Sequence, residues 1–234
     1  MKSEWIERLD LLSTPHLADA CLRVGVPVRC APSDLQAIDV TMHCAGRVRP
    51  ARHVGSVDIF LEALEHAEPG DVLVVDDAGR HDRSCVGDMV TREVQMAGLA
   101  GIVIWGCHRD TLELLEIGLP FFSQGKISTG PLSVDRRSPD ALEWARVGNW
   151  VVSPEDVVVG DCDGVIFLPI DRLPEIVSAA EAIRNTEHQQ AEMVRCGKSL
   201  RAQLAFNDYL AEYSRNSAYG FREHLRKIGG AVEE

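Results

Sequence analysis

An alternation of strand and helix patterns between residues 71 and 105 is the feature that most constrains the fold of this chain. The apolar run within 71–76 predicts a β-strand, the amphipathic stretch at 88–98 predicts a helix, and the apolar run at 101–105 predicts a second strand. Two parallel strands joined by a helix place their carboxyl ends at the same edge of a sheet. We therefore expect an α/β protein in which the residues that follow these two strands face one crevice.

Charged residues fall at that edge after each strand. Asp88 opens the predicted helix beside Gly87, and Arg109 and Asp110 follow the second strand, with 20 residues between Asp88 and Arg109. A helix N-terminus presents unpaired N–H groups to a carboxylate, and a glycine lets the backbone approach that anion closely. The expected substrate-binding and catalytic residues are Gly87, Asp88, Met89, Val90 and Arg109.

Arg109 and Asp110 differ in the chemistry that they offer. The planar guanidinium of Arg109 matches a carboxylate or an enolate oxygen beside one. Asp110 is a hard oxygen ligand that suits Mg²⁺ or Mn²⁺, and Mg²⁺ needs only one or two protein carboxylates when the substrate supplies further ligands. The pattern therefore predicts a site for an anionic ligand together with a divalent cation at Asp110.

Structural explanations compete with this interpretation. Aspartate is a common helix N-cap, so Asp88 or Asp110 alone is explained as well by capping. The two together, beside a glycine and at one sheet edge, favour a functional site. Of their neighbours, we expect His108 to have a structural role and Lys126 to lie in a solvated loop, where it does not form a Schiff base.

The spacing of Asp88, Arg109 and Asp110 resembles the signature of the RraA-like proteins, a family that includes 4-hydroxy-4-methyl-2-oxoglutarate aldolases. The resemblance extends over residues 15–205 and includes Pro69–Asp76 and Val158–Pro169. It implies a swivelling β/β/α domain that assembles into trimers or hexamers. It also implies that Glu187, ten residues before Gly197, is a metal ligand that reaches the site of a neighbouring subunit.

The resemblance further implies a metal-dependent class II aldolase. Such a lyase cleaves a 4-hydroxy-2-oxo acid to pyruvate, and the same chemistry allows oxaloacetate decarboxylation. A metal on Asp110 would act as a Lewis acid, and Arg109 would neutralise the enolate oxygen. A water activated by the metal or held by Asp88 would serve as base. Two alternatives stay open: a protein-binding regulator of a ribonuclease complex, as some members are, and a methyltransferase. Residues 76–80 hold a single glycine, which disfavours the methyltransferase.

Length and composition limit the domain organisation, the partners and the cellular location that we expect. The 234 residues can form one domain at 1–205, with helices at its N-terminus, and a C-terminal helical extension at 206–234. A net charge of −12 argues against nucleic acid and anionic membranes as partners.

The seven cysteines include no Cys-x-x-Cys pair, which argues against a disulfide scaffold or a thiolate zinc site. With no apolar signal core and no apolar run long enough to span a membrane, the chain is expected to be cytoplasmic.

Two segments depart from the family pattern and are rich in charge. Residues 44–52 carry three arginines, and residues 80–85 form an unusual polar run. Some of these arginines could meet the extra carboxylates of a di- or tricarboxylate substrate, although most are expected to be surface charges or partners of acidic residues. The arginines concerned are Arg47, Arg49, Arg52, Arg80 and Arg83.

The other expected elements follow from periodicity and turn residues. Helices are predicted within 4–26 (in two pieces), 56–68, 110–117, 171 to about 213, and 221–228. Strands are predicted within 36–50, 121–123, 149–152, 156–160 and 164–168.

Overall fold

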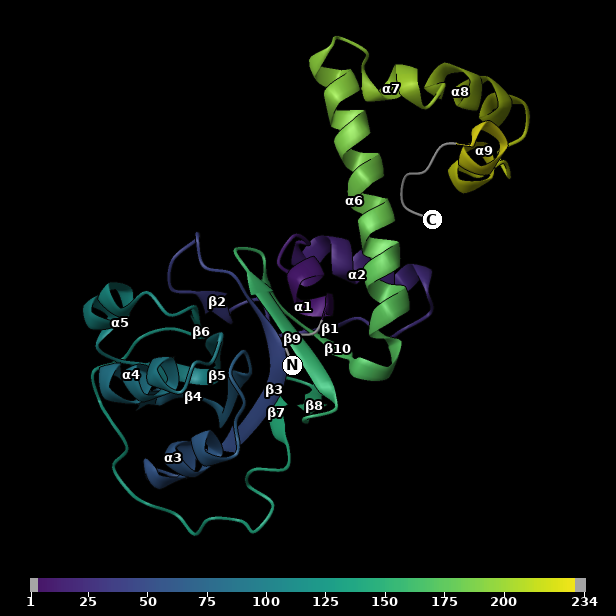
Figure 1. The fold of residues 1–234 in the computed structure, drawn as a ribbon. Coiled ribbons are helices and arrows are strands. Elements are labelled where there is room, and N and C mark those ends of the chain that lie inside the picture. The colour runs from purple at the N-terminus through teal and green to yellow at the C-terminus, as the bar shows by residue number, and fades with distance from the viewer. Residues whose placement is uncertain (1–3, 230–234) are drawn as a thin grey trace.

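A computed structural model of the protein describes residues 4–229, which form a curled central sheet with helices outside it (Figure 1). The eight strands of the sheet are hydrogen-bonded in the order β1-β10-β9-β3-β4-β5-β6-β2, and β7 pairs with β8 in a separate ribbon. The strands are β1 (Arg29–Cys30), β2 (Gln36–Ala37), β3 (Cys44–Arg52), β4 (Val72–Val86), β5 (Gly101–His108), β6 (Phe121–Ser123), β7 (Ala145–Val147), β8 (Trp150–Val152), β9 (Asp156–Asp161) and β10 (Gly164–Pro169). The helices are α1 (Glu4–Leu9), α2 (Thr14–Arg23), α3 (Asp58–Glu65), α4 (Asp88–Met96), α5 (Thr111–Ile117), the 3₁₀ turn η1 (Ile170–Arg172), α6 (Leu173–Arg195), α7 (Leu200–Gln203), α8 (Phe206–Arg215) and α9 (Phe221–Ile228).

One half of the sheet is the predicted parallel α/β unit. Strands β3, β4, β5 and β6 run parallel to one another, and α3, α4 and α5 cover their outer face (Figure 1). Each of these helices turns its apolar positions inward, as Phe60 of α3, Val94 of α4 and Leu114 of α5 are buried against the strands. The alternation of strand and helix patterns therefore gave the correct connectivity, and the α/β class is confirmed.

The other half of the sheet is antiparallel and is covered by helices from both ends of the chain. Strand β9 pairs antiparallel with β3 and β10, while α1, α2 and the first half of α6 pack over these strands. Helix α2 is anchored at its start because Thr14 donates from its backbone N–H and its hydroxyl to Asp161, at 2.7 Å each. Helices α1 and α2 and the first half of α6 thus form one layer on the side of the sheet opposite α3–α5 (Figure 1).

The sheet curls until strands that are distant in its order touch across its interior. Strands β9 and β6 are separated by β3, β4 and β5 in the sheet, yet a Cβ placed on Gly160 of β9 would lie 2.8 Å from the ring of Phe122 on β6. A buried cluster that includes Val48, Val103 and Phe167 fills the enclosed space. The barrel-like closure was not predicted, because apolar alternation within a strand does not reveal how far a sheet bends.

Strand β4 is much longer than predicted. The sequence indicated a strand at 71–76 followed by a loop, whereas β4 spans 15 residues and ends at Val86. Its pairing with β5 shifts register three times beyond Asp76, and Ala78 and Gly79 have φ angles of 60° and 64°. Bulges of this kind leave residues unpaired and bend a strand. The charged composition of residues 76–84 therefore reflects a bulged strand rather than a loop.

The second half of α6 extends beyond the sheet and carries α7, α8 and α9 at its far end (Figure 1). A domain limit at residue 205 stays a prediction, and residues 230–234 of the proposed extension lie outside the described part of the chain. Within residues 4–229, no helix has both the length and the apolar character that crossing a bilayer requires.

The contact between Gly160 and Phe122 gives a test of the curled sheet. Gly160→Ala places a methyl group 2.8 Å from a buried ring, so we expect the free energy of unfolding to fall by about 1–3 kcal/mol. Gly130→Ala is the matched control, since its Cβ would meet only the mobile end of Arg109. Urea denaturation measures both, and equal stability of the two variants would contradict the closure.

Candidate active site

The register between β4 and β5 brings the two charged motifs together. Val86, at the end of β4, is the register partner of His108, at the end of β5, and the Arg109 N–H donates to the Val86 carbonyl at 3.1 Å. Asp88 lies two residues after Val86, and Asp110 lies two residues after His108, so the two aspartates leave the sheet side by side. The backbone N–H of Asp88 donates to Oδ2 of Asp110 at 3.4 Å.

Asp110 occupies the N-cap position of α5 but does not use its carboxylate as a cap. Its backbone is left-handed, with φ 59° and ψ 42°, and its side chain makes no capping hydrogen bond. Oδ2 instead faces the start of α4 and lies 3.4 Å from Nε of Arg109. A left-handed backbone is costly for most residues, although aspartate and asparagine tolerate it best. The carboxylate of Asp110 therefore does not cap α5; it faces the crevice, where it accepts from the first N–H of α4.

Gly87 makes room for this carboxylate. It is the N-cap of α4, and a Cβ there would lie 2.2 Å from Oδ2 of Asp110 and 3.2 Å from Cγ of Arg109. Its φ of −133° is open to other residues, so the need for glycine comes from the close approach of the two side chains. Asp88 follows as the first residue of α4 rather than as its cap, and its Oδ2 lies 3.9 Å from Nε of Arg92.

The first turn of α4 also contains Met89 and Val90. Val90 is buried against the sheet, whereas Met89 is largely exposed. The first N–H groups of a helix have no partner within the helix, and the positive end of its dipole favours an anion there. Residues 87–90 thus place a backbone anion site directly beside Asp110.

A pocket of about 510 Å³ opens in front of Arg109 and Asp110. Thr111, Lys126, Ile127 and Ser128 complete its lining. Lys126 is exposed, as expected for a solvated loop, but sequence reasoning left it out of the site. The signal that places it there is a parallel bridge between His108 and Lys126, a long-range pairing that local patterns do not reveal. Two cations and one carboxylate in an open pocket suit an anionic ligand that shares a metal with Asp110.

His108 fixes the base of the pocket. It is buried, its Nδ1 lies 2.7 Å from the Ser123 hydroxyl, and its Nε2 lies 2.9 Å from the Thr111 hydroxyl. Burial, and then the charge of Lys126, lower the pKa of His108 below its ordinary value. The neutral imidazole ties β5, β6 and α5 together, which is a positioning role.

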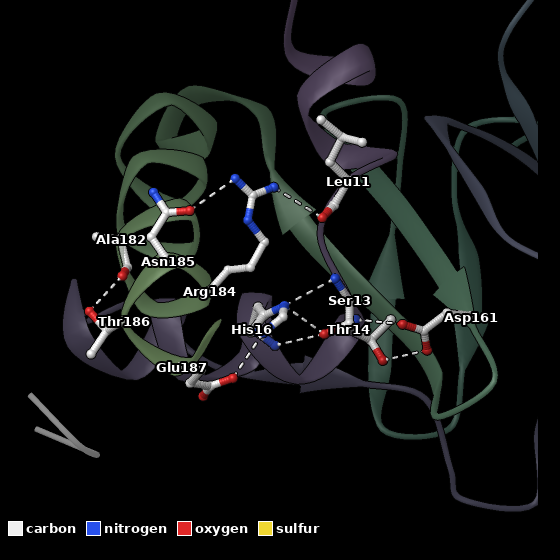
Figure 2. Close-up of polar contacts among 10 residues, drawn as sticks. All are labelled: Leu11, Ser13, Thr14, His16, Asp161, Ala182, Arg184, Asn185, Thr186 and Glu187. Carbon is white, nitrogen blue, oxygen red and sulfur yellow. Dashed lines mark hydrogen bonds and ion pairs between the residues drawn. The ribbon is translucent and has the colours of Figure 1, made fainter. Parts of the chain in front are cut away.

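Glu187 lies elsewhere in the chain. It projects from α6 and its Oε2 is 3.0 Å from Nε2 of His16 on α2, as Figure 2 shows. Helix α6 and helix α5, whose start borders the Asp110 pocket, lie on opposite sides of the sheet (Figure 1). A single chain therefore does not bring Glu187 and Asp110 together, and the expected role of Glu187 concerned a neighbouring subunit.

Four of the five extra arginines have partners outside this pocket. Arg49 pairs with Asp71 at 2.7 Å, and Arg83 lies 3.3 Å from Asp77. Arg47 donates to the Pro154 carbonyl at 2.6 Å. Arg52 pairs with Asp140 and stacks on Trp144. None of the five lines the pocket at Asp110 within the described residues. A subsite for extra substrate carboxylates formed by any of them stays a prediction.

This α/β domain, which has paired aspartates at a sheet edge, matches a known protein family. The family described as RraA-like (Aldolase/RraA) matches residues 14–167. The chain belongs to the RraA-like family.

Individual relatives agree with this assignment at modest identity. A protein of Halalkalibacterium halodurans, named "putative 4-hydroxy-4-methyl-2-oxoglutarate aldolase", is 30% identical over 145 residues, which are 57% of this chain and 65% of that protein. The chain thus matches less than two thirds of the length of that curated relative.

Two solved structures share the fold. RraAS2 of Streptomyces coelicolor, described as an unusual member of the RNase ES inhibitor RraA protein family, superposes with a TM-score of 0.70 at 27% identity and covers 82% of this chain and 98% of its own. An uncharacterized protein of Pseudomonas syringae gives a TM-score of 0.74 at 23% identity and covers 86% and 96%. The predicted RraA-like α/β fold is therefore confirmed.

The close approach at Gly87 gives a test of the site. Gly87→Ala forces the carboxylate of Asp110 and the stem of Arg109 to move, and a displacement near 1 Å costs about 100-fold in rate where geometry is critical. The measurement is metal-dependent pyruvate release from 4-hydroxy-4-methyl-2-oxoglutarate. Gly220→Ala is the matched control because Gly220 is also a helix N-cap with open space around it. Equal loss in both variants would show that the defect comes from helix capping.

Proposed function

We propose that this protein is a divalent-metal-dependent carbon–carbon lyase that acts on a 4-hydroxy-2-oxo acid such as 4-hydroxy-4-methyl-2-oxoglutarate and releases pyruvate. The observation that carries the proposal is the carboxylate of Asp110, held on a left-handed backbone and turned away from its own helix toward Arg109 and the start of α4. The names of the curated relatives support the lyase class.

The residues at Asp110 fit a divalent cation such as Mg²⁺ or Mn²⁺. Asp110 offers a hard oxygen beside an open pocket, and Mg²⁺ accepts one protein carboxylate when water and substrate oxygens complete its shell. When bound, the ion supplies Lewis-acid polarisation of the 2-oxo group. Of the N–H groups of residues 88–90, that of Asp88 donates to Asp110, so those of Met89 and Val90 hold the substrate carboxylate and orient the 2-oxo group toward Arg109.

The bond changes then follow from the side chains present. The C4 hydroxyl loses its proton to a water held by Asp88, the C3–C4 bond breaks, and its electron pair moves to C3 and the C2 oxygen. Arg109 neutralises the charge that develops on this oxygen. Protonation of C3 completes pyruvate, while C4 leaves as the carbonyl of the second product. Loss of CO₂ from oxaloacetate generates the same three-carbon anion, so we propose decarboxylation as a side activity.

A second candidate is a protein-binding role, supported by the similarity to RraAS2, whose description names an RNase inhibitor family. Such a role does not require a carboxylate in an open pocket. The two functions are separable by experiment, because substitution of Asp110 removes the first and leaves the outer surface needed for the second.

We also propose that the active protein is a homotrimer or hexamer in which Glu187 completes the metal site of a neighbouring subunit. Glu187 is half-exposed and held by His16 at the surface of the α2–α6 layer, so it is available to a second copy of the chain.

The charge of Asp110 is tested by Asp110→Asn, which keeps the side-chain shape and the tolerance for a left-handed backbone. We expect metal-dependent pyruvate release to fall at least about 100-fold, with a similar loss in Arg109→Lys. Asp208→Asn, an exposed position on α8, is the matched control and should retain full activity. Activity that survives in Asp110→Asn would rule out the proposed metal ligand.

The shared site is tested by mixing inactive variants. If Glu187 serves a neighbouring subunit, hetero-oligomers of Asp110→Asn and Glu187→Gln contain some sites with both native residues, and part of the activity returns. A mixture of Asp110→Asn and Arg109→Lys should stay inactive, since both residues come from the same chain. Full activity of Glu187→Gln alone would exclude the proposed role.

A further inference from the structure

A second cluster of ligand-type side chains lies at the same edge of the sheet but shares no residue with the Asp110 pocket. His53 follows β3, while Asp77 and Cys85 come from the two ends of the bulged part of β4. One ligand atom from each of the three lies within 4.8 Å of the others. The side chains of His53 and Asp77 are 2% and 0% exposed, so a carboxylate is held in the interior next to an imidazole and a thiol.

The carboxylate of Asp77 is satisfied on one oxygen only. Oδ1 accepts from His53 Nδ1 at 2.9 Å and from Arg83 at 3.3 Å. Oδ2 is buried and has no hydrogen-bond partner among the described residues. A buried polar atom left without a partner costs free energy, and buried polar groups in native proteins are almost always paired.

The backbone around Asp77 leaves room for its side chain and brings Cys85 close to it. A Cβ on Gly106 of β5 would lie 2.9 Å from Cβ of Asp77 and 3.4 Å from its Oδ2. The register shifts of β4, with Ala78 and Gly79 in the left-handed region, return Cys85 to the neighbourhood of Asp77 after eight residues. Strained backbone of this kind persists where the surrounding structure requires it.

We propose that His53, Asp77 and Cys85 form a second metal site, one that takes a zinc-class divalent cation. The unpaired Oδ2 of Asp77, the imidazole of His53 and Sγ of Cys85 would be its three protein ligands. Nitrogen, oxygen and sulfur donors together suit Zn²⁺, whereas Mg²⁺ prefers oxygen alone. On binding, the thiol proton of Cys85 passes to solvent and the imidazole keeps one proton on its other nitrogen.

The nearby arginine is compatible with a cation. The carboxylate of Asp77 and the thiolate of Cys85 balance two of the three positive charges of the ion and Arg83, and an anion at the open coordination position would balance the third. Arg83 remains bound to Oδ1 of Asp77, as outer partners commonly hold a ligating carboxylate in place. Three protein ligands leave one coordination position for water or for an anion. A pocket of about 250 Å³, lined in part by His53, Arg80 and Arg136, lies beside the cluster.

This site escapes motif searches because its ligands are far apart in sequence. His53 and Asp77 are 24 positions apart, one after β3 and the other within β4, and the seven cysteines form no Cys-x-x-Cys pair. The absence of a Cys-x-x-Cys pair disfavours a zinc site built on paired thiolates, but not one with a single cysteine ligand. The proposal is also independent of the lyase activity, since it uses neither Asp110 nor Arg109.

Cobalt binding tests the proposal directly. Full-length protein is stripped with a chelator and titrated with Co²⁺ without oxygen, and absorption reports the ligands. A cysteine ligand gives a sulfur-to-cobalt charge-transfer band in the near ultraviolet, and Zn²⁺ should displace the cobalt. We expect one band-forming site per chain in the native protein and in Asp110→Asn, where the proposed lyase site is disabled.

Substitutions then assign the ligands. Cys85→Ser should abolish the band, and Asp77→Asn should weaken Zn²⁺ binding by more than the roughly 10–100-fold that loss of an outer partner costs. Cys107→Ser is the control, because its thiol is also buried on the neighbouring strand. Circular dichroism confirms that each variant is folded, and if Cys85→Ser is unfolded, Asp77→Asn carries the test. Absence of the band in folded native protein, or its loss in Cys107→Ser instead, would overturn the proposal.

Discussion

The pairing of β4 with β5 is the constraint on which the candidate site depends. Because Val86 and His108 are register partners at the ends of these parallel strands, the two chain segments that follow leave the sheet together. That pairing brings Asp110 to the start of α4 and sets the need for a glycine at position 87. A shift of one residue in either strand would reverse the faces of its side chains and separate the two motifs. The separation of 20 residues between Asp88 and Arg109 is thus the length of one α4–β5 crossover.

The parts of the fold that the sequence predicts are those that depend on local periodicity and on the crossover rule. Helices α3, α4 and α5 carry clear apolar stripes, and right-handed crossovers fix which strand ends meet. The length of β4 was not predictable, because bulged residues lack apolar alternation and the polar run from Asp77 to Ser84 has the composition of a loop. The curling of the sheet depends on contacts such as Gly160 with Phe122, which join strands far apart in the chain. Periodicity contains no information about either.

Side-chain partners were less predictable than backbone positions for the same reason. The sequence places Gly87, Asp88, Arg109 and Asp110 correctly, since their positions follow from strand ends. It leaves Lys126 out, because a parallel bridge to His108 brings that loop to the pocket. It also leaves open what the arginines in residues 44–52 and 80–85 bind, and the structure shows carboxylate partners for Arg49, Arg52 and Arg83. Charge alone indicates that a partner exists, and only the tertiary structure identifies it.

The two polar clusters at the carboxyl edge of the sheet differ in the feature that decides what each can bind. Asp110 stands in an open pocket with cationic neighbours, so a ligand that brings its own oxygens can share a hard metal with it. His53 follows β3, whereas Asp77 and Cys85 lie in the bulged part of β4; the side chains of His53 and Asp77 are buried, and the donors are mixed in kind. Donor type and exposure therefore decide which ion each proposed site can bind. At Asp110 they follow from regular strand ends, and at Asp77 and Cys85 they follow from bulges. The irregular part of β4, which includes one of the two segments that depart from the family pattern, supplies two of the three ligands proposed for the second site.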